Sequence, residues 1–96
     1  MTKWVLPGTL RLPTSRRDGV DPLKLAAQYR LYGSSIVGMS AIEVTEDADG
    51  LLMINDGVTR ATRVHRYSPE GTLVPVIVID SRPRWHLKSL PRISER

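Results

Sequence analysis

Hydrophobic and polar residues alternate near the start of the chain. Leu10 and Leu12 flank Arg11, and this spacing predicts a half-exposed strand within Trp4–Leu12. Pro7 in the same stretch indicates an edge position or a bend. The following residues, from position 13 to 18, are rich in Pro, Thr, Ser and Arg and are predicted to form a loop.

The spacing then becomes helical. Asp21 followed by Pro22 is a typical helix start, since Asp caps the first turn and proline fits the first helical position. Gly33 predicts the end of this helix. Between them, six residues are expected to form a broad apolar stripe: Leu23, Ala26, Ala27, Tyr29, Leu31 and Tyr32.

Two short strands follow. Ser40–Thr45 is predicted to be a strand with Ile42 and Val44 facing inward, and Leu51–Asn55 is predicted to be the next. The acid-rich segment 46–50 is predicted to form the turn between them, so the two strands should form an antiparallel hairpin.

The second half contains a short basic helix and an apolar strand. Helical spacing begins at Val58 and ends near Ser68, where Pro69 follows. Leu73–Asp80 is rich in β-branched residues and is expected to be the most buried strand, despite an internal proline. The order strand, helix, hairpin, helix, strand predicts a small α+β domain with a mixed sheet and two or more short helices. We expect this domain to span residues 1–80 and residues 81–96 to form a basic C-terminal extension.

Composition narrows the functional classes. The chain has 96 residues, enough for one domain, and no cysteine, which excludes disulfides and thiolate metal sites. The absence of cysteine favours a cytoplasmic protein. The first residues, Met1 to Leu12, do not show a signal-peptide pattern, and no apolar run approaches the roughly 20 residues that span a bilayer. The net charge is +4 and 11 of the 14 basic residues are Arg, a side chain suited to bidentate phosphate contacts. This balance favours polyanionic partners, although it is also an ordinary charge for solubility.

A strand–glycine–helix junction is the main candidate site. A glycine at such a turn lets a ligand approach the backbone, and the first N–H groups of the helix attract an anion. The candidate ligand-binding residues are Asp56, Gly57, Val58, Thr59, Arg60 and Arg63. Arg60 is the expected phosphate clamp, with Arg16 or Arg17 as further contacts. The alternative is an ordinary tight turn, with Arg60, Arg63 and Arg66 on a solvated helix face.

The same stretch resembles a known superfamily. The segments 52–61 and 74–80, preceded by the helix ending at Gly33, resemble the ParB/sulfiredoxin-like superfamily over about residues 4–80. The resemblance implies CTP or ATP binding at this junction, with Gly57, Thr59 and Arg60 matching the motif. Val58 stands where ParB modules carry Glu and sulfiredoxins their catalytic Cys, so cysteine redox repair is excluded. The family's Gly-x-Gln-Pro box is absent from residues 33–40.

Other features are weaker candidates. Arg82, Arg84, Trp85 and Lys88 combine positive charge with an aromatic ring, a pattern that can hold single-stranded nucleic acid, but a functionless basic tail fits as well. The acidic turn resembles the opening of a calcium loop, yet Val58 occupies the twelfth position, so no metal site is predicted. His65 and His86 have no metal-type spacing.

Three functions remain open. The first is a non-enzymatic module that binds a nucleotide phosphate, with Mg²⁺ as a candidate companion, or a nucleic-acid backbone. The second is a nuclease or nucleotide triphosphatase in which Asp56 binds Mg²⁺ or acts as a base. The third is a homodimer or protein-interaction module whose ligand site has decayed.

Overall fold

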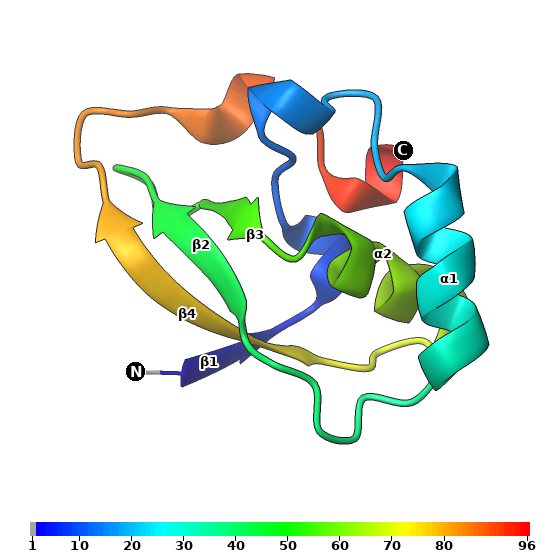
Figure 1. Cartoon of the computed structure of the whole chain (residues 1–96). Coiled ribbons are helices and arrows are strands. Elements are labelled where there is room, and N and C mark those ends of the chain that lie inside the picture. The colour runs from blue at the N-terminus through cyan, green and yellow to red at the C-terminus, as the bar shows by residue number, and fades with distance from the viewer. Residues whose placement is uncertain (1) are drawn as a thin grey trace.

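Four strands form one mixed sheet in the order β1-β4-β2-β3 (Figure 1). The computed structural model describes residues 2–96. The strands are β1 (Thr2–Val5), β2 (Ile42–Glu46), β3 (Leu52–Asp56) and β4 (Val74–Ser81). The helices are α1 (Pro22–Tyr32) and α2 (Val58–Tyr67). Four 3-10 turns complete the fold: η1 (Pro7–Thr9), η2 (Thr14–Arg16), η3 (Leu87–Ser89) and η4 (Ile93–Glu95). The predicted α+β class, with a mixed sheet and two helices, is therefore confirmed. None of the described helices is long and apolar enough to cross a bilayer.

The sheet topology places the start of α2 at the end of an edge strand. β2 and β3 pair as the predicted antiparallel hairpin. After β3 the chain turns into α2 and returns as β4, which lies parallel to β2 and antiparallel to β1. The connection from the hairpin to β4 thus carries α2 across one face of the sheet, and α1 packs on α2 rather than on the strands (Figure 1).

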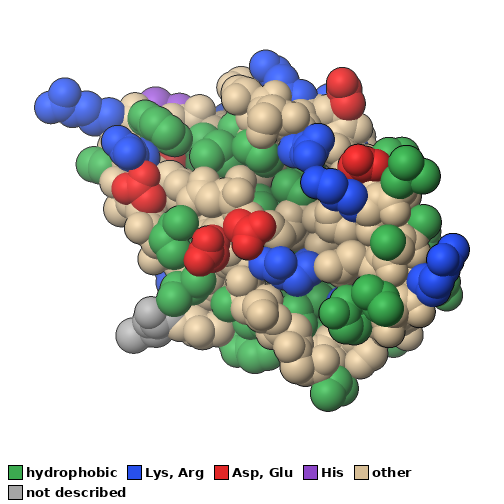
Figure 2. All heavy atoms as spheres, in the orientation of Figure 1, with side chains coloured by type: hydrophobic (Ala, Val, Ile, Leu, Met, Phe, Trp, Pro, Cys, Tyr) green, Lys and Arg blue, Asp and Glu red, His purple; other side chains and the backbone are tan. Residues whose placement is uncertain are grey.

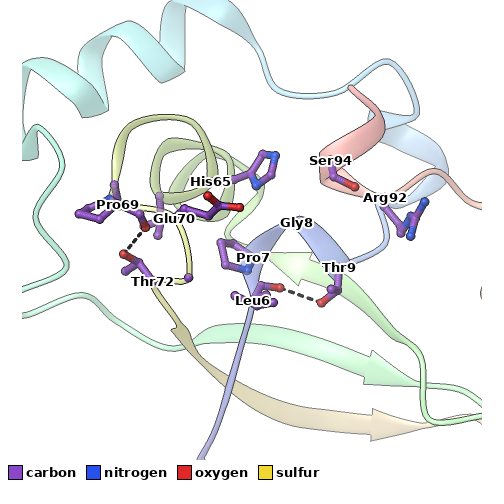
Figure 3. Close-up of a pocket in the computed structure, with 13 residues that line it drawn as sticks. Leu6, Pro7, Gly8, Thr9, His65, Pro69, Glu70, Thr72, Arg92 and Ser94 are labelled. Atoms are coloured by element: carbon purple, nitrogen blue, oxygen red, sulfur yellow. Dashed lines mark hydrogen bonds between the residues drawn. The ribbon is translucent and has the colours of Figure 1, made fainter.

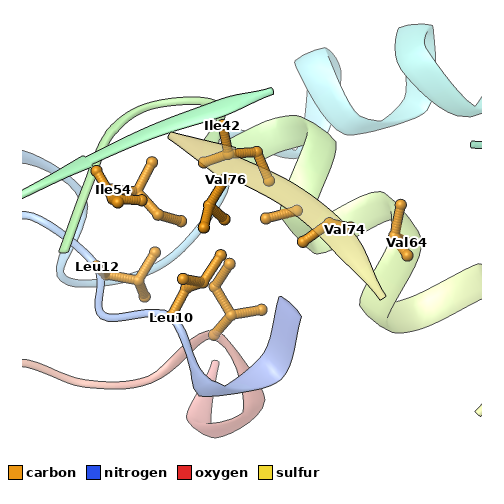
Figure 4. Packing of buried hydrophobic residues seen from close by; sticks show 10 residues of the cluster. Leu10, Leu12, Ile42, Ile54, Val64, Val74 and Val76 are labelled. Atoms are coloured by element: carbon orange, nitrogen blue, oxygen red, sulfur yellow. The ribbon is translucent and has the colours of Figure 1, made fainter. Parts of the chain in front are cut away.

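The core lies between the sheet and α2. Ile42 and Val44 of β2 are fully buried, which confirms their predicted orientation. They pack with residues of β3, β4 and α2, namely Ile54, Val74, Val76, Ala61 and Val64 (Figure 4). Each large aliphatic side chain buried in this way contributes about 1.5–3 kcal/mol to stability. The prediction that β4 is the most buried strand is wrong. The first half of β4 is buried, but its second half is more exposed, and a larger share of β2 is buried.

The N-terminal strand lies earlier in the chain than predicted and does not include Leu10, Arg11 and Leu12. β1 ends at Val5, because Pro7 begins the 3-10 turn η1, which confirms the predicted bend. The chain then runs beside β3, where the Arg11 N–H donates to the Leu52 carbonyl at 2.8 Å. Leu10 and Leu12 on either side are buried in the core (Figure 4). This segment covers the edge of β3 that would otherwise be open.

Helix α1 has the predicted bounds but not the predicted apolar stripe. The Asp21 carboxylate accepts a hydrogen bond from the Leu23 N–H at 2.9 Å, and Gly33 ends the helix at φ +58°. Leu25 alone among its residues is buried, while Leu23 is 82% and Leu31 73% exposed. The predicted stripe is wrong because α1 packs mainly against a single neighbour, α2, which covers one side of the helix.

Residues 81–96 do not form a basic tail. Leu87, Leu90, Pro91 and Ile93 are buried, and Ile93 belongs to the main core cluster. Backbone hydrogen bonds join Leu12 N–H to the Pro91 carbonyl at 2.8 Å and Ile93 N–H to the Leu10 carbonyl at 3.0 Å. A small domain has a thin core, and these aliphatic residues complete it. The expected division at residue 80 therefore does not separate a domain from an extension.

Candidate anion-binding site

Gly57 forms the junction between β3 and α2. Its φ of +118° favours glycine, and a Cβ there would lie 3.0 Å from Ile42 Cγ1 and 2.9 Å from Arg60 Nη2. The first helical hydrogen bond runs from Ala61 N–H to the Gly57 carbonyl at 2.9 Å. No side chain caps this end of α2. The first N–H groups of the helix therefore stay available, with the partial positive charge of a helix N-terminus.

A cleft of about 310 Å³ opens at this junction. Its walls come from the η2 loop, the first turns of α1, the end of β3 and the start of α2. Three basic side chains line it, Arg16, Lys24 and Arg60, together with two acids, Asp21 and Asp56. Figure 2 shows Lys and Arg side chains at several places on one face of the molecule, some of them beside acidic side chains. The volume is at the lower end of the about 300–1,000 Å³ typical of small-molecule sites.

Arg60 is held beside the junction with spare hydrogen-bonding capacity. Its Nη2 lies 3.7 Å from the Asp56 carboxylate and 3.4 Å from the Ala41 carbonyl. Its Nε is buried without a partner in the structure. The side chain is 22% exposed, so the charge is partly withdrawn from water.

The cleft brings together most of the predicted ligand-binding residues. Asp56, Gly57, Val58, Thr59 and Arg60 all line it, and so does Arg16. Arg17 lines other hollows. Sequence reasoning missed Lys24 and Gln28, which enter because the first turns of α1 form one wall. These two residues can be recognised as lining residues only from the packing of α1 on α2, although the Asp21 cap correctly predicted where α1 begins.

Arg63 is not part of this cleft. It is 2% exposed, and its guanidinium donates to the Gly33 carbonyl at 2.9 Å, the Ser35 carbonyl at 2.7 Å and Gln28 Oε1 at 3.1 Å. Burial lowers the pKa of Arg63, while Tyr32 beside it opposes this shift. Both sequence interpretations, ligand contact and solvated face, are therefore wrong for Arg63. It fastens α2 to the end of α1.

The four residues proposed for nucleic acid do not form a single surface. Arg82 pairs with Asp80 at 2.7 Å and lies 5.2 Å from the centre of the Trp85 ring, which is 43% exposed. Arg84 is exposed and does not line the cleft at the β3–α2 junction. Lys88 lines a different hollow, with residues of the N-terminal loop. The buried Leu87 lies between Trp85 and Lys88 in the chain, and Lys88 lies apart from the Arg82–Trp85 pair in this lining.

The acidic turn between β2 and β3 is structural. Asp47 is 6% exposed, and its carboxylate accepts hydrogen bonds from the N–H groups of Asp49, Leu51 and Leu87 at 2.8–2.9 Å. Burial alone would raise the pKa of Asp47, but these donors outweigh it and the pKa is lowered, with a smaller contribution from His86. The carboxylate is thus occupied in joining the hairpin to the C-terminal segment. Among residues 2–96, no cluster of three potential metal ligands exists.

A larger cavity lies elsewhere, near the C-terminal end of α2 (Figure 3). It measures about 580 Å³ and is lined by η1, η4 and the loop after α2. In its walls, the Thr9 and Thr72 hydroxyls donate to the Leu6 and Pro69 carbonyls at 2.7 and 2.6 Å. His65 stands against Gly8, where a Cβ would lie 2.9 Å from the ring. None of the residues predicted to bind ligand lines this cavity.

Comparisons with protein-family models, curated proteins and solved structures find no match for this chain. The resemblance to the ParB/sulfiredoxin-like superfamily therefore stays a prediction.

Proposed function

We propose that this protein is a small binding domain that holds a phosphate-bearing ligand in the cleft at the β3–Gly57–α2 junction. One observation carries the proposal: three basic side chains from three separate elements meet at an uncapped helix N-terminus. Helix N–H groups and basic side chains together are the usual protein partners of phosphate oxygens.

The charges around the cleft suggest how a phosphate binds. The N–H groups at the start of α2 bind one side of the anion, and Arg60 supplies the nearest charged donor. Arg16 and Lys24 neutralise the remaining charge from the opposite wall. The exposed Asp56 carboxylate opposes a bare phosphate, and a Mg²⁺ ion between the two would relieve that repulsion. The resemblance to nucleotide-binding modules points to the same junction.

The expected affinity is modest. Three hydrogen bonds to charged groups contribute up to about 9 kcal/mol, at about 3 kcal/mol each, and association itself costs about 4–5 kcal/mol at the low end of its range. The remaining free energy of about −4 to −5 kcal/mol corresponds to a Kd of roughly 0.2–1 mM.

A nuclear magnetic resonance titration tests the proposal. Labelled protein is titrated with inorganic phosphate, CTP and ATP, each with and without Mg²⁺. We expect saturable shifts of the amides from Gly57 to Arg60, and Arg60→Gln should weaken binding about tenfold, or about 1.4 kcal/mol. Arg30→Gln is the matched control, because Arg30 is exposed and outside the cleft. Absence of shifts with every ligand, or equal affinity in Arg60→Gln, refutes the site.

The enzymatic alternative rests on Asp56 alone. Its side chain is 70% exposed and lines the cleft beside Arg60, so it is the carboxylate best placed to bring Mg²⁺ to a bound phosphate. Mg²⁺-dependent hydrolysis of a nucleotide or nucleic acid that is abolished by Asp56→Asn would support this alternative. Binding without turnover would leave the protein as a binding domain.

A further inference from the structure

A second basic hollow is built from the two ends of the chain. It measures about 430 Å³ and is lined by Arg11, Arg17, Lys88, Arg92 and Arg96, with Glu95 as its acid. A third hollow of about 450 Å³ connects it to the cleft at α2, since it shares Arg16 with that cleft and both Arg17 and Arg96 with the second hollow. We call the Lys and Arg residues of these three hollows the basic belt.

The net charge of the chain resides on this belt. Its hollows contain eight of the 14 basic residues but four of the 10 acidic ones, Asp18, Asp21, Asp56 and Glu95. The remaining six basic and six acidic residues balance each other. The +4 charge is therefore concentrated on one continuous surface, whereas an ordinary solubility charge would be dispersed.

Several belt residues are fixed in place without losing their charge. Arg11 donates to the Leu90 carbonyl at 2.9 Å, and its Nε is buried without a partner. Arg96 donates to the Arg17 carbonyl at 2.8 Å. Carbonyl groups hold these guanidinium groups but do not neutralise them. Two ion pairs, Arg60–Asp56 and Arg92–Glu95, are formed by belt residues within the described chain.

The shape of the belt selects among polyanions. A mononucleotide occupies one hollow, whereas three connected hollows fit a chain of phosphates. Single-strand binding relies on bases stacked on aromatic rings, and no aromatic residue lines any of these hollows. Backbone contact without stacking is the mode by which proteins bind duplexes independently of sequence.

We propose that the basic belt binds the phosphate backbone of duplex nucleic acid. This inference deepens the proposed function, since the α2 cleft is one end of the belt, but Arg11, Arg17, Lys88, Arg92 and Arg96 support it independently. Sequence reasoning assigned Lys88 to nucleic acid but grouped it with the wrong neighbours.

Fluorescence anisotropy with labelled 24-base-pair DNA, at several salt concentrations, tests the belt. The probe variant is Arg17→Gln with Lys88→Gln, two exposed residues whose side chains form no hydrogen bond in the structure. The control is Arg30→Gln with Arg84→Gln, which removes the same charge from outside the belt. Duplex RNA and single-stranded DNA of equal length complete the comparison.

We expect micromolar to submillimolar binding at 0.1 M salt, with log affinity falling steeply as log salt rises. The probe variant should lose about tenfold or more in affinity, and its salt slope should fall by about 2, one unit for each lost contact. The control should change affinity by no more than about threefold. Equal losses in both variants, tighter binding of single strands, or no duplex binding at 50 mM salt would each overturn the proposal.

The two proposals fail separately. Nucleotide-induced shifts at the α2 cleft without duplex binding would retain the phosphate site and reject the belt. Duplex binding that depends on Arg17 and Lys88 but not on Arg60, with no nucleotide shifts, would establish duplex binding at the second and third hollows and reject the cleft.

Discussion

Arg63 gives the sharpest test of the structure, because the sequence suggested a ligand contact or a solvated residue and the structure buries it. The perturbation is Arg63→Ala. It removes hydrogen bonds to the Gly33 and Ser35 carbonyls and to Gln28, and it removes the cation 5.4 Å from the Tyr32 ring centre. The link between α2 and the end of α1 would then be lost.

The magnitude follows from these contacts. Hydrogen bonds from a charged group contribute about 1.5–3 kcal/mol each, and an unpaired buried carbonyl costs about 1–3 kcal/mol. Burying the guanidinium offsets part of the gain, as the lowered pKa of Arg63 indicates. We therefore expect Arg63→Ala to reduce the free energy of unfolding by about 3 kcal/mol. For a domain of this size that is a Tm decrease of about 12–24 °C.

Urea denaturation followed by circular dichroism measures this change, with Arg84→Ala as the control. Arg84 is exposed, and the structure shows no hydrogen bond or ion pair for its side chain, so its variant should stay within about 0.5 kcal/mol of the parent. Arg63→Lys should be intermediate, because one ammonium group cannot reproduce the planar contacts to three acceptors. If Arg63→Ala costs less than 1 kcal/mol, the side chain is not buried in solution and the reasoning is refuted.

Three further predictions concern stability. Gly57→Ala should lower the free energy of unfolding by about 1–3 kcal/mol, because of the positive φ at this position and the contact of an added Cβ with Ile42. Gly71→Ala is the control: its φ is +85° and no atom lies within 4 Å of an added Cβ, so thermal unfolding should show a smaller loss of stability. Ile93→Ala should lower the free energy of unfolding by about 3 kcal/mol in urea denaturation, because the Ile93 residue is 3% exposed. A change near zero would mean that residues 81–96 form a tail and do not pack in the core. The pKa of Asp47 is lower in the folded state, so its contribution is present above the ordinary carboxyl pKa near 4 and is lost as pH falls through the folded pKa. Asp47→Asn should therefore destabilise the protein at pH 7 and reduce the loss of stability that the parent shows at acidic pH. The measurement is the urea midpoint as a function of pH, and an unchanged dependence in Asp47→Asn would contradict this prediction.

Local patterns in the sequence determined most of the elements. Asp21 and Gly33 mark the ends of α1, because capping and left-handed backbone conformations depend on residues at those positions alone. The alternation in β2 correctly placed Ile42 and Val44 in the core. The junction at Gly57 was also predictable, because the glycine and the start of α2 are adjacent in the chain.

The tertiary structure alone decided which side of each element meets a neighbour. Arg60 and Arg63 lie one turn apart on α2, yet Arg60 lines a cleft while Arg63 is buried against α1, and helical spacing contains no information about where α1 packs. The same holds for residues 81–96, whose aliphatic side chains are few and spaced among charges, so their burial depends on a core with room for them. The basic belt joins Arg11 and Arg17 to Arg92 and Arg96 across most of the chain length. Contacts between residues so distant in sequence arise only when the sheet and helices have packed, because no local propensity specifies them.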